Sequence, residues 1–220
     1  MTEQINKFQR IFKGTKMKTK KLLFYLLAAL LAGCVPSLHP LYTDKDLTFE
    51  EKLSGSWSDG EQIWKFEGDS EEKSYELIVI DKDLKKGEFT AHLVKIDSML
   101  FLDLFPEEPE LQANDFYKFH LLPVHTFVGV EQIEPTLKMR MMDPDTIKQM
   151  LENDPNLIKH EIVEEDRVVL TASTEQLQVL MKKHANDKDF FGDTGEFKRL
   201  QLQEPNEPND INSNENSTKE

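Results

Sequence analysis

Cys34 is the residue whose chemistry can be inferred most directly, because the residues before it follow a definite order. It is the only cysteine of the 220-residue chain. A lysine-rich segment that ends at Lys21 is followed by an unbroken apolar run, Leu22–Leu31, and then by the small residues Ala32 and Gly33. A positive segment, a short apolar segment and small residues at the cleavage point are the parts of a secretory signal peptide. The thiol of Cys34 therefore lies where such a peptide is cut.

The apolar run is too short to be a membrane-spanning helix. At about 1.5 Å per helical residue, it covers about half of a hydrocarbon core that is about 30 Å thick. A buried core helix is also disfavoured, because a lysine cluster near the chain end directly precedes the run. We therefore expect residues 1–33 to be a signal peptide that is removed. The polar leader 1–16 leaves open whether Met1 or Met17 is the initiator.

The segment Leu31-Ala32-Gly33-Cys34 resembles the lipobox of bacterial lipoproteins. This resemblance implies that the thiol of Cys34 carries a diacylglyceryl group and that signal peptidase II cuts before this residue. It also implies that the new N-terminus is acylated, for example with palmitate. We expect no cofactor besides this covalent lipid.

Residues 36–42 are also similar to the start of uncharacterised bacterial lipoproteins. Val35 gives no aspartate retention signal, which by resemblance to enteric lipoproteins favours a lipid-anchored place in the cell envelope, at the outer membrane if the host has one.

The charge of the chain after the signal peptide excludes one class of partner. Residues 1–33 contain seven of the 27 basic and one of the 41 acidic residues, so the rest of the chain has 20 basic and 40 acidic residues and a formal net charge of −20. Such a surface repels nucleic acid and anionic lipid head groups. We therefore expect no nucleic-acid partner, and membrane attachment through the acyl chains alone.

The sequence lacks the common motifs of catalysis and metal binding. We find no Gly-x-Ser-x-Gly, no glycine-rich phosphate loop and no His-Glu-x-x-His. A zinc site needs three or four converging ligands, for which His92, His120 and His125 are candidates. The odd spacing between His120 and His125 places them on opposite faces of a strand, unless Pro123 disrupts that register. We therefore expect no enzyme and no metal site, with structural or surface roles for the histidines.

The elements that position these residues are mainly strands. Between residues 54 and 143, apolar side chains alternate with polar ones in short runs separated by turn-forming residues. The expected strands centre on Trp64–Phe66, Tyr75–Val79, Phe89–Leu93, Leu100–Leu104, Tyr117–Leu121, Phe127–Val130 and Leu137–Met141. Short strands at this spacing predict an antiparallel meander that curls into a barrel or half-barrel, so that the fold class is α+β.

The last third of the chain predicts two or three helices around one strand pair. Asp143 and Pro144 are typical of a helix start, and a capping box at Ser173–Gln176 opens a second helix. Strands are expected at 160–164 and 168–172. The overall organisation is then a tether, 34–53, a single domain, 54–202, and an acidic tail, 203–220, that we expect to be disordered.

Gly55-Ser56-Trp57, at the start of the first strand, resembles the Gly-x-Trp signature of lipocalins. In that family the barrel mouth holds a small apolar ligand. The resemblance implies a lipocalin-like barrel. For a ligand cavity we expect a lining of the following residues: Trp64, Leu77, Phe89, Leu102 and Phe119.

Two functions fit these expectations. The first is a non-catalytic binding or assembly module of the envelope, whose partner is an envelope protein or polymer that contacts an exposed apolar patch or sheet edge. The alternative is a lipocalin-like carrier of a small apolar ligand.

Overall fold

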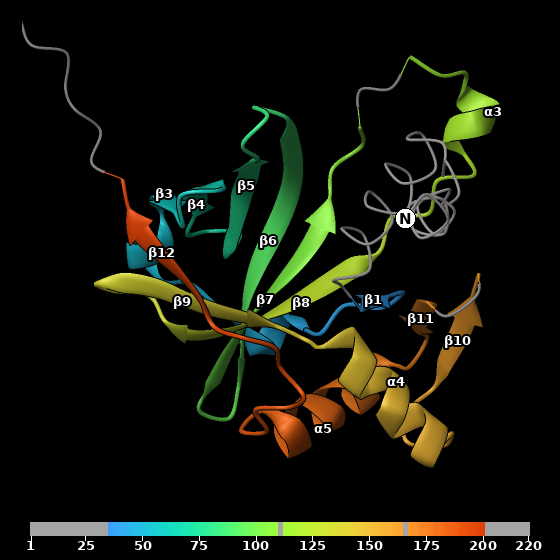
Figure 1. The fold of residues 1–220 in the computed structure, drawn as a ribbon. Helices are drawn as coiled ribbons and strands as arrows, with labels where there is room; N and C mark the ends of the chain where they lie inside the picture. Colours follow the sequence, from blue (N-terminus) through green and yellow to red (C-terminus); the bar gives the residue numbers. More distant parts are fainter. Residues whose placement is uncertain (1–34, 110–111, 165–166, 201–220) are drawn as a thin grey trace, which may run out of the picture.

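Eight antiparallel strands close into a barrel, which confirms the expected fold class (Figure 1). The structure, a computed structural model, describes residues 35–109, 112–164 and 167–200. Each strand pairs with the next along the chain as far as β9, which also pairs with β12, and β12 pairs back to β3. The barrel strands are β3 (Gly55–Ser58), β4 (Ile63–Asp69), β5 (Ser74–Ile80), β6 (Lys86–Ile96), β7 (Met99–Pro106), β8 (His125–Gln132), β9 (Thr136–Met141) and β12 (Gly195–Arg199).

The barrel forms because alternate residues of its strands are apolar and point inward. Leu77 of β5 pairs with Phe66 on one side and with Phe89 on the other, so one row of apolar side chains crosses three strands. The interior is filled by fifteen buried side chains. They include Trp57, Trp64, Phe66, Tyr75, Leu77, Ala91, Leu93, Leu102, Leu104, Val128, Val130, Leu137, Met139 and Phe197.

An insertion between β9 and β12 covers the outer wall of the barrel. It consists of α4 (Pro144–Asn153), β10 (His160–Val163), β11 (Arg167–Leu170) and α5 (Thr174–His184). Both helices begin as the sequence predicts: the Asp143 carboxylate accepts the Thr146 N–H at 2.7 Å, and Ser173 forms a capping box with Gln176. Apolar residues of the insertion form a second core against outward residues of β6, β7 and β8, such as Val94, Phe101 and Phe127.

The segment before the barrel packs along this same wall. It contains β1 (Pro36–Ser37), a 3-10 helix, η1 (Asp44–Asp46), β2 (Leu47–Thr48) and a second 3-10 helix, η2 (Glu51–Leu53). β1 lies between β8 and β11, and β2 pairs with β6. Val35 and Leu41 are buried in the second core, so the expected tether lies on the barrel from its first described residue. Cys34, the signal peptide 1–33 and the tail 203–220 lie outside the described residues.

Two elements differ from the expected ones. The strand expected at Tyr117–Leu121 is a one-turn helix, α3 (Asp115–Lys118), and a loop, because Asn114 accepts the Tyr117 N–H and starts a helical turn. The closing strand β12 has no counterpart among the expected strands, since its apolar side is reduced to Phe197 between charged neighbours. Among the described residues, no helix combines the length and apolar character that a membrane span requires.

Candidate binding groove at the rim of the barrel

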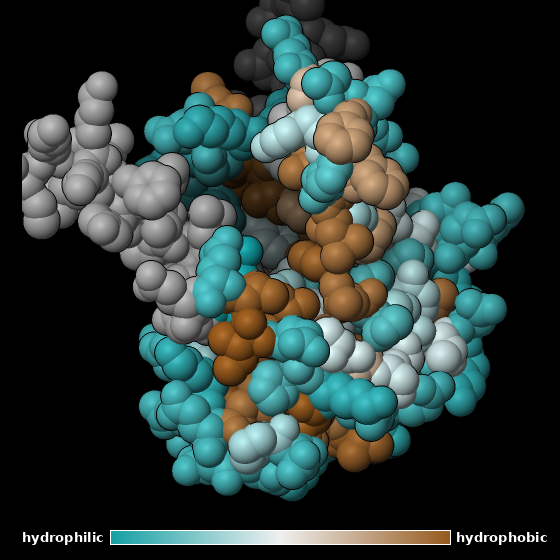
Figure 2. Space-filling model, turned by 90° about the vertical axis from the view of Figure 1, so that its right-hand side faces the viewer, coloured by the Kyte–Doolittle hydropathy of each residue, from teal (hydrophilic) through white to brown (hydrophobic). Residues whose placement is uncertain are grey.

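One end of the barrel carries a groove. Because neighbouring strands are antiparallel, the β5–β6 turn and the connection between β7 and β8 lie at the same end, which we call the rim. The later part of that connection, residues 112–124, contains α3 and is called the excursion. The groove has a volume of about 1240 Å³ and lies between the start of β6, the end of β7 and the excursion. Figure 2 shows the face that carries the excursion, with apolar side chains around a hollow.

The groove has apolar walls with charged groups among them. Its apolar lining comes from all three segments: Phe89 from β6, Phe105 from β7, and Phe119, Leu121 and Leu122 from the excursion. The charged lining consists of four carboxylates and two lysines, namely Glu88, Glu107, Glu108, Asp115, Lys86 and Lys118. Concave sites with apolar walls and a few polar groups are typical of small-molecule binding. The arrangement suits an apolar chain with a small polar end.

Local contacts hold the excursion in shape. Asn114 caps α3, and the His120 ring nitrogen Nδ1 lies 2.7 Å from the carbonyl oxygen of Phe116. The ring of His120 contacts both Phe116 and Phe119, with centroids 4.7 Å and 5.6 Å apart. The Lys118 ammonium lies 3.8 Å from the Glu108 carboxylate. The aromatic residues between positions 116 and 120 therefore form a small projection, which we call the knob. Most of the surface of these side chains is exposed.

The structure does not place the five expected lining residues around one cavity. Phe89 and Phe119 both line the groove, although Phe119 comes from the excursion and not from a barrel strand. Trp64 lines a smaller hollow of about 540 Å³ beside Met139 and Phe197. Leu77 and Leu102 are fully buried in the barrel interior. Sequence reasoning missed Phe105 and Leu122, because strand alternation cannot show that a loop folds back over the rim.

The Gly-x-Trp motif has a structural reason at the opposite end of the barrel. Gly55 has φ +124°, and a Cβ there would lie 2.5 Å from the Arg199 guanidinium. That guanidinium stacks on the Trp57 ring at 4.2 Å and donates to the carbonyl oxygens of Ser54 and Lys52. The Trp57 indole N–H donates to the Leu53 carbonyl at 2.9 Å. Glycine is required here by the backbone conformation and by the space that the arginine occupies.

A buried polar cluster fastens the N-terminal segment to the outer wall. Asp103 is 1% exposed, accepts the Leu41 N–H at 2.6 Å and lies 2.7 Å from His125 Nδ1. The His92 ring contacts the Tyr42 ring in a tilted arrangement with centroids 4.5 Å apart, and burial lowers the pKa of His92. Burial together with Asp103 raises the pKa of Tyr42. The two contacts of Asp103 thus join the N-terminal segment to β7 and β8. Among the described residues no group of three His, Cys, Asp or Glu side chains is arranged to hold a metal ion.

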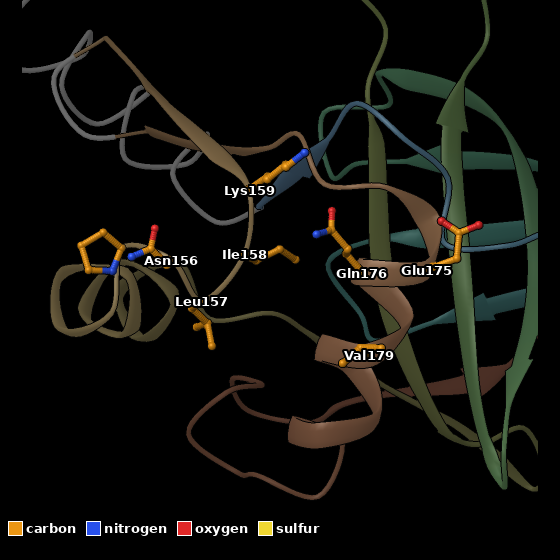
Figure 3. A pocket seen from close by; sticks show the side chains of 8 residues that line it. Asn156, Leu157, Ile158, Lys159, Glu175, Gln176 and Val179 are labelled. Atoms are coloured by element: carbon orange, nitrogen blue, oxygen red, sulfur yellow. The ribbon is translucent and has the colours of Figure 1, made fainter.

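A second hollow lies on the insertion, away from the barrel rim. It has a volume of about 540 Å³ and is lined by residues 155–159 and by Glu175, Gln176 and Val179 of α5. Figure 3 shows the two sets of side chains on either side of the hollow. Lys159 and Glu175 are exposed to solvent, and the lining mixes polar and apolar groups without a buried acid, base or nucleophile. It therefore offers no chemistry that competes with the groove as the candidate site.

Comparisons with known proteins give no further assignment: no family model, no curated protein and no solved structure matches the chain. The class is therefore defined by the fold itself, a closed antiparallel β-barrel that is compatible with a lipocalin-like, ligand-binding module.

Proposed function

We propose that the protein is a lipid-anchored, non-catalytic binding module of the bacterial cell envelope, and that the rim groove carries an apolar or amphiphilic ligand. The observation that carries the proposal is the groove of about 1240 Å³ with Phe89, Phe105 and Phe119 in its walls. The barrel interior is filled by buried side chains, so the ligand is held at the rim and not in the lumen. The carrier function that we propose therefore uses the rim groove instead of the expected central cavity.

The lipid anchor is supported by the order of the residues around Cys34. The lipobox-like segment ends at that cysteine, and Val35, the next residue, is already buried in the second core. An acyl anchor on Cys34 would therefore hold the barrel against the membrane with almost no free chain between them.

An assembly function is the second candidate. It is favoured by β10, whose outer edge pairs with no described strand and which exposes Ile162 and Val163. An exposed strand edge can accept a strand of another protein. Crosslinking in intact cells from position 162 would capture an envelope protein under this function, whereas a ligand carrier gives no specific crosslink there.

The groove is tested by native mass spectrometry of the acylated protein, extracted gently from its envelope. We expect a discrete mass beyond the covalent lipid, which disappears after extraction with organic solvent. Leu122→Asp should lose this adduct, because it places a carboxylate in the apolar wall. Leu84→Asp is the matched control, since Leu84 is a similarly exposed leucine of the rim that does not line the groove. Wild-type protein without an adduct, or equal adducts in both variants, would contradict the proposal.

The anchor is tested separately by Cys34→Ala. This variant should lose palmitate labelling and accumulate as the uncut precursor. Persistent labelling would show that the acyl group is not on Cys34.

A further inference from the structure

The excursion has an apolar side that the groove does not use. Phe116 and Tyr117 of α3 are 76% and 58% exposed and do not line the groove. Two more apolar residues of the excursion, Phe119 and Leu122, are 85% and 72% exposed although they form part of the groove wall. A ligand in the groove could cover only one side of this knob. The apolar side chains on the other side, Phe116 and Tyr117, would stay exposed to water unless a second apolar surface covered them.

The excursion ends beside the segment that follows the proposed anchor. β1 pairs with the first residues of β8, Pro36 with Thr126 and Ser37 with His125, and the excursion ends at Val124. Figure 1 shows β1 and α3 on the same side of the barrel. The Cα atom of Cys34 is about 3.8 Å from that of Val35. A lipid on Cys34 thus brings the bilayer surface close to the first residues of β8, next to which the excursion ends.

The residue types of the knob suit the surface layer of a bilayer. Tyrosine is enriched where a membrane meets water, because its ring is apolar and its hydroxyl group is polar, and phenylalanine adds apolar area. The charged lining of the groove, with four carboxylates and two lysines, disfavours an anionic head group and suits a neutral or zwitterionic one that carries an ammonium group.

We infer that α3 inserts into the surface layer of the bilayer that holds the Cys34 lipid, and that the groove takes up an acyl chain of a zwitterionic lipid from this bilayer. The inference rests on the proposed lipid anchor and names the ligand class of the proposed groove. The ligand then passes between bilayer and groove without crossing water.

The position of α3 is tested with the acylated protein in phosphatidylcholine vesicles. Acylation consumes the only native thiol, so Phe116→Cys provides a single site for an environment-sensitive fluorophore. Val179→Cys is the control, because Val179 is an exposed apolar residue of α5 that lies on the insertion. With nitroxide-labelled lipid in the vesicles, we expect quenching and a blue shift at position 116 and neither at position 179.

The outcomes separate the inference from the function on which it rests. If the protein floats with the vesicles but the two positions respond equally, α3 is outside the bilayer and the inference is overturned while the anchor stands. If the protein does not float, the anchor and the inference fail together. Native mass spectrometry from the same vesicles tests the ligand: an adduct with the mass of the vesicle lipid supports the assignment, and a protein without an adduct overturns it.

Discussion

At the residue scale, Arg199 shows how one side chain unites distant parts of the chain. It stacks on Trp57, donates to the carbonyl groups of Lys52 in η2 and of Ser54, and contacts Glu134 in the β8–β9 turn. The first strand, the last strand and a turn are thereby joined at the end of the barrel opposite the groove. The sequence motif Gly55-x-Trp57 contains only the residues that the first strand contributes to this arrangement, because Arg199 lies far away in the chain.

Arg199→Ala should therefore destabilise the barrel. Loss of a cation–π contact and of two hydrogen bonds, at a side chain that is partly exposed, is expected to lower the free energy of unfolding by about 2 kcal/mol. Arg199→Lys should recover only part of this, because an ammonium group cannot stack and donate to two carbonyl groups at once. Urea unfolding measures both. Lys198→Ala on the same strand is the control, with an expected change below about 0.5 kcal/mol.

His92 provides a pH-dependent contribution to stability. Its pKa is lowered in the folded protein, mainly by burial, with His125 acting in the same direction and Asp103 opposing. In the unfolded chain the pKa is about 6.5. As the pH falls below that value, the unfolded state binds the proton first, so stability is full above about pH 6.5 and is lost as the pH falls through the folded pKa.

His92→Gln should remove this contribution. The free energy of unfolding, measured in urea between about pH 7 and pH 5, should fall less steeply with decreasing pH than in the wild-type protein. Equal slopes for the two proteins would show that burial of the His92 imidazole does not make the free energy of unfolding depend on pH. That result would contradict the prediction. Tyr42, which contacts the His92 ring, is unaffected in this pH range because burial raises its pKa above the ordinary value of 10.0.

At the element scale, β12 decides whether the sheet closes. Its residues pair with β9 through Gly195–Lys198 and with β3 through Lys198 and Arg199. Without it, β3 and β9 would each have a free edge, and the interior would be open to water between them. Sequence patterning missed this strand because a strand with a single buried side chain has no visible alternation.

Truncation of the chain tests that role. A stop after Asp193 removes β12 and should abolish the cooperative thermal transition seen by near-UV circular dichroism. A stop after Leu202 is the matched control and should leave the melting temperature nearly unchanged, because the Glu, Pro and Asn residues of 203–220 offer little apolar surface to bury. A clear loss of stability in this second variant would contradict the expectation of a disordered tail.

At the scale of the whole molecule, two cores share one wall. The inner side chains of β6, β7 and β8 face the barrel interior, and their outer side chains face the insertion and the N-terminal segment. β7 is therefore apolar on both faces over Leu100–Phe105, with Asp103 as the polar exception. A strand that is buried on both sides reads as a nearly continuous apolar run. The alternation of Leu100, Leu102 and Leu104 indicates only one face of that run, so the covered wall was not predicted.

The placement of groove and anchor also belongs to this scale. The excursion projects beside β1, so the proposed ligand site and the proposed membrane attachment lie on one side of the barrel. Arg199 and Trp57 close the other end. The contacts between Arg199 and Trp57 therefore lie at the end of the barrel away from the surface that we expect to meet the bilayer.

Features that depend on neighbouring residues could be predicted from the order of amino acids alone. Alternation marked most barrel strands, and caps at Asp143 and Ser173 marked α4 and α5, because side-chain periodicity and capping hydrogen bonds are local. The lipobox-like order before Cys34 is local too, and it stays a prediction. Three features became visible only in the folded chain: the closure through β12, the separation of the expected lining residues, and the groove beside the excursion. These depend on segments that meet across long stretches of chain, and no pattern of adjacent residues specifies such a meeting.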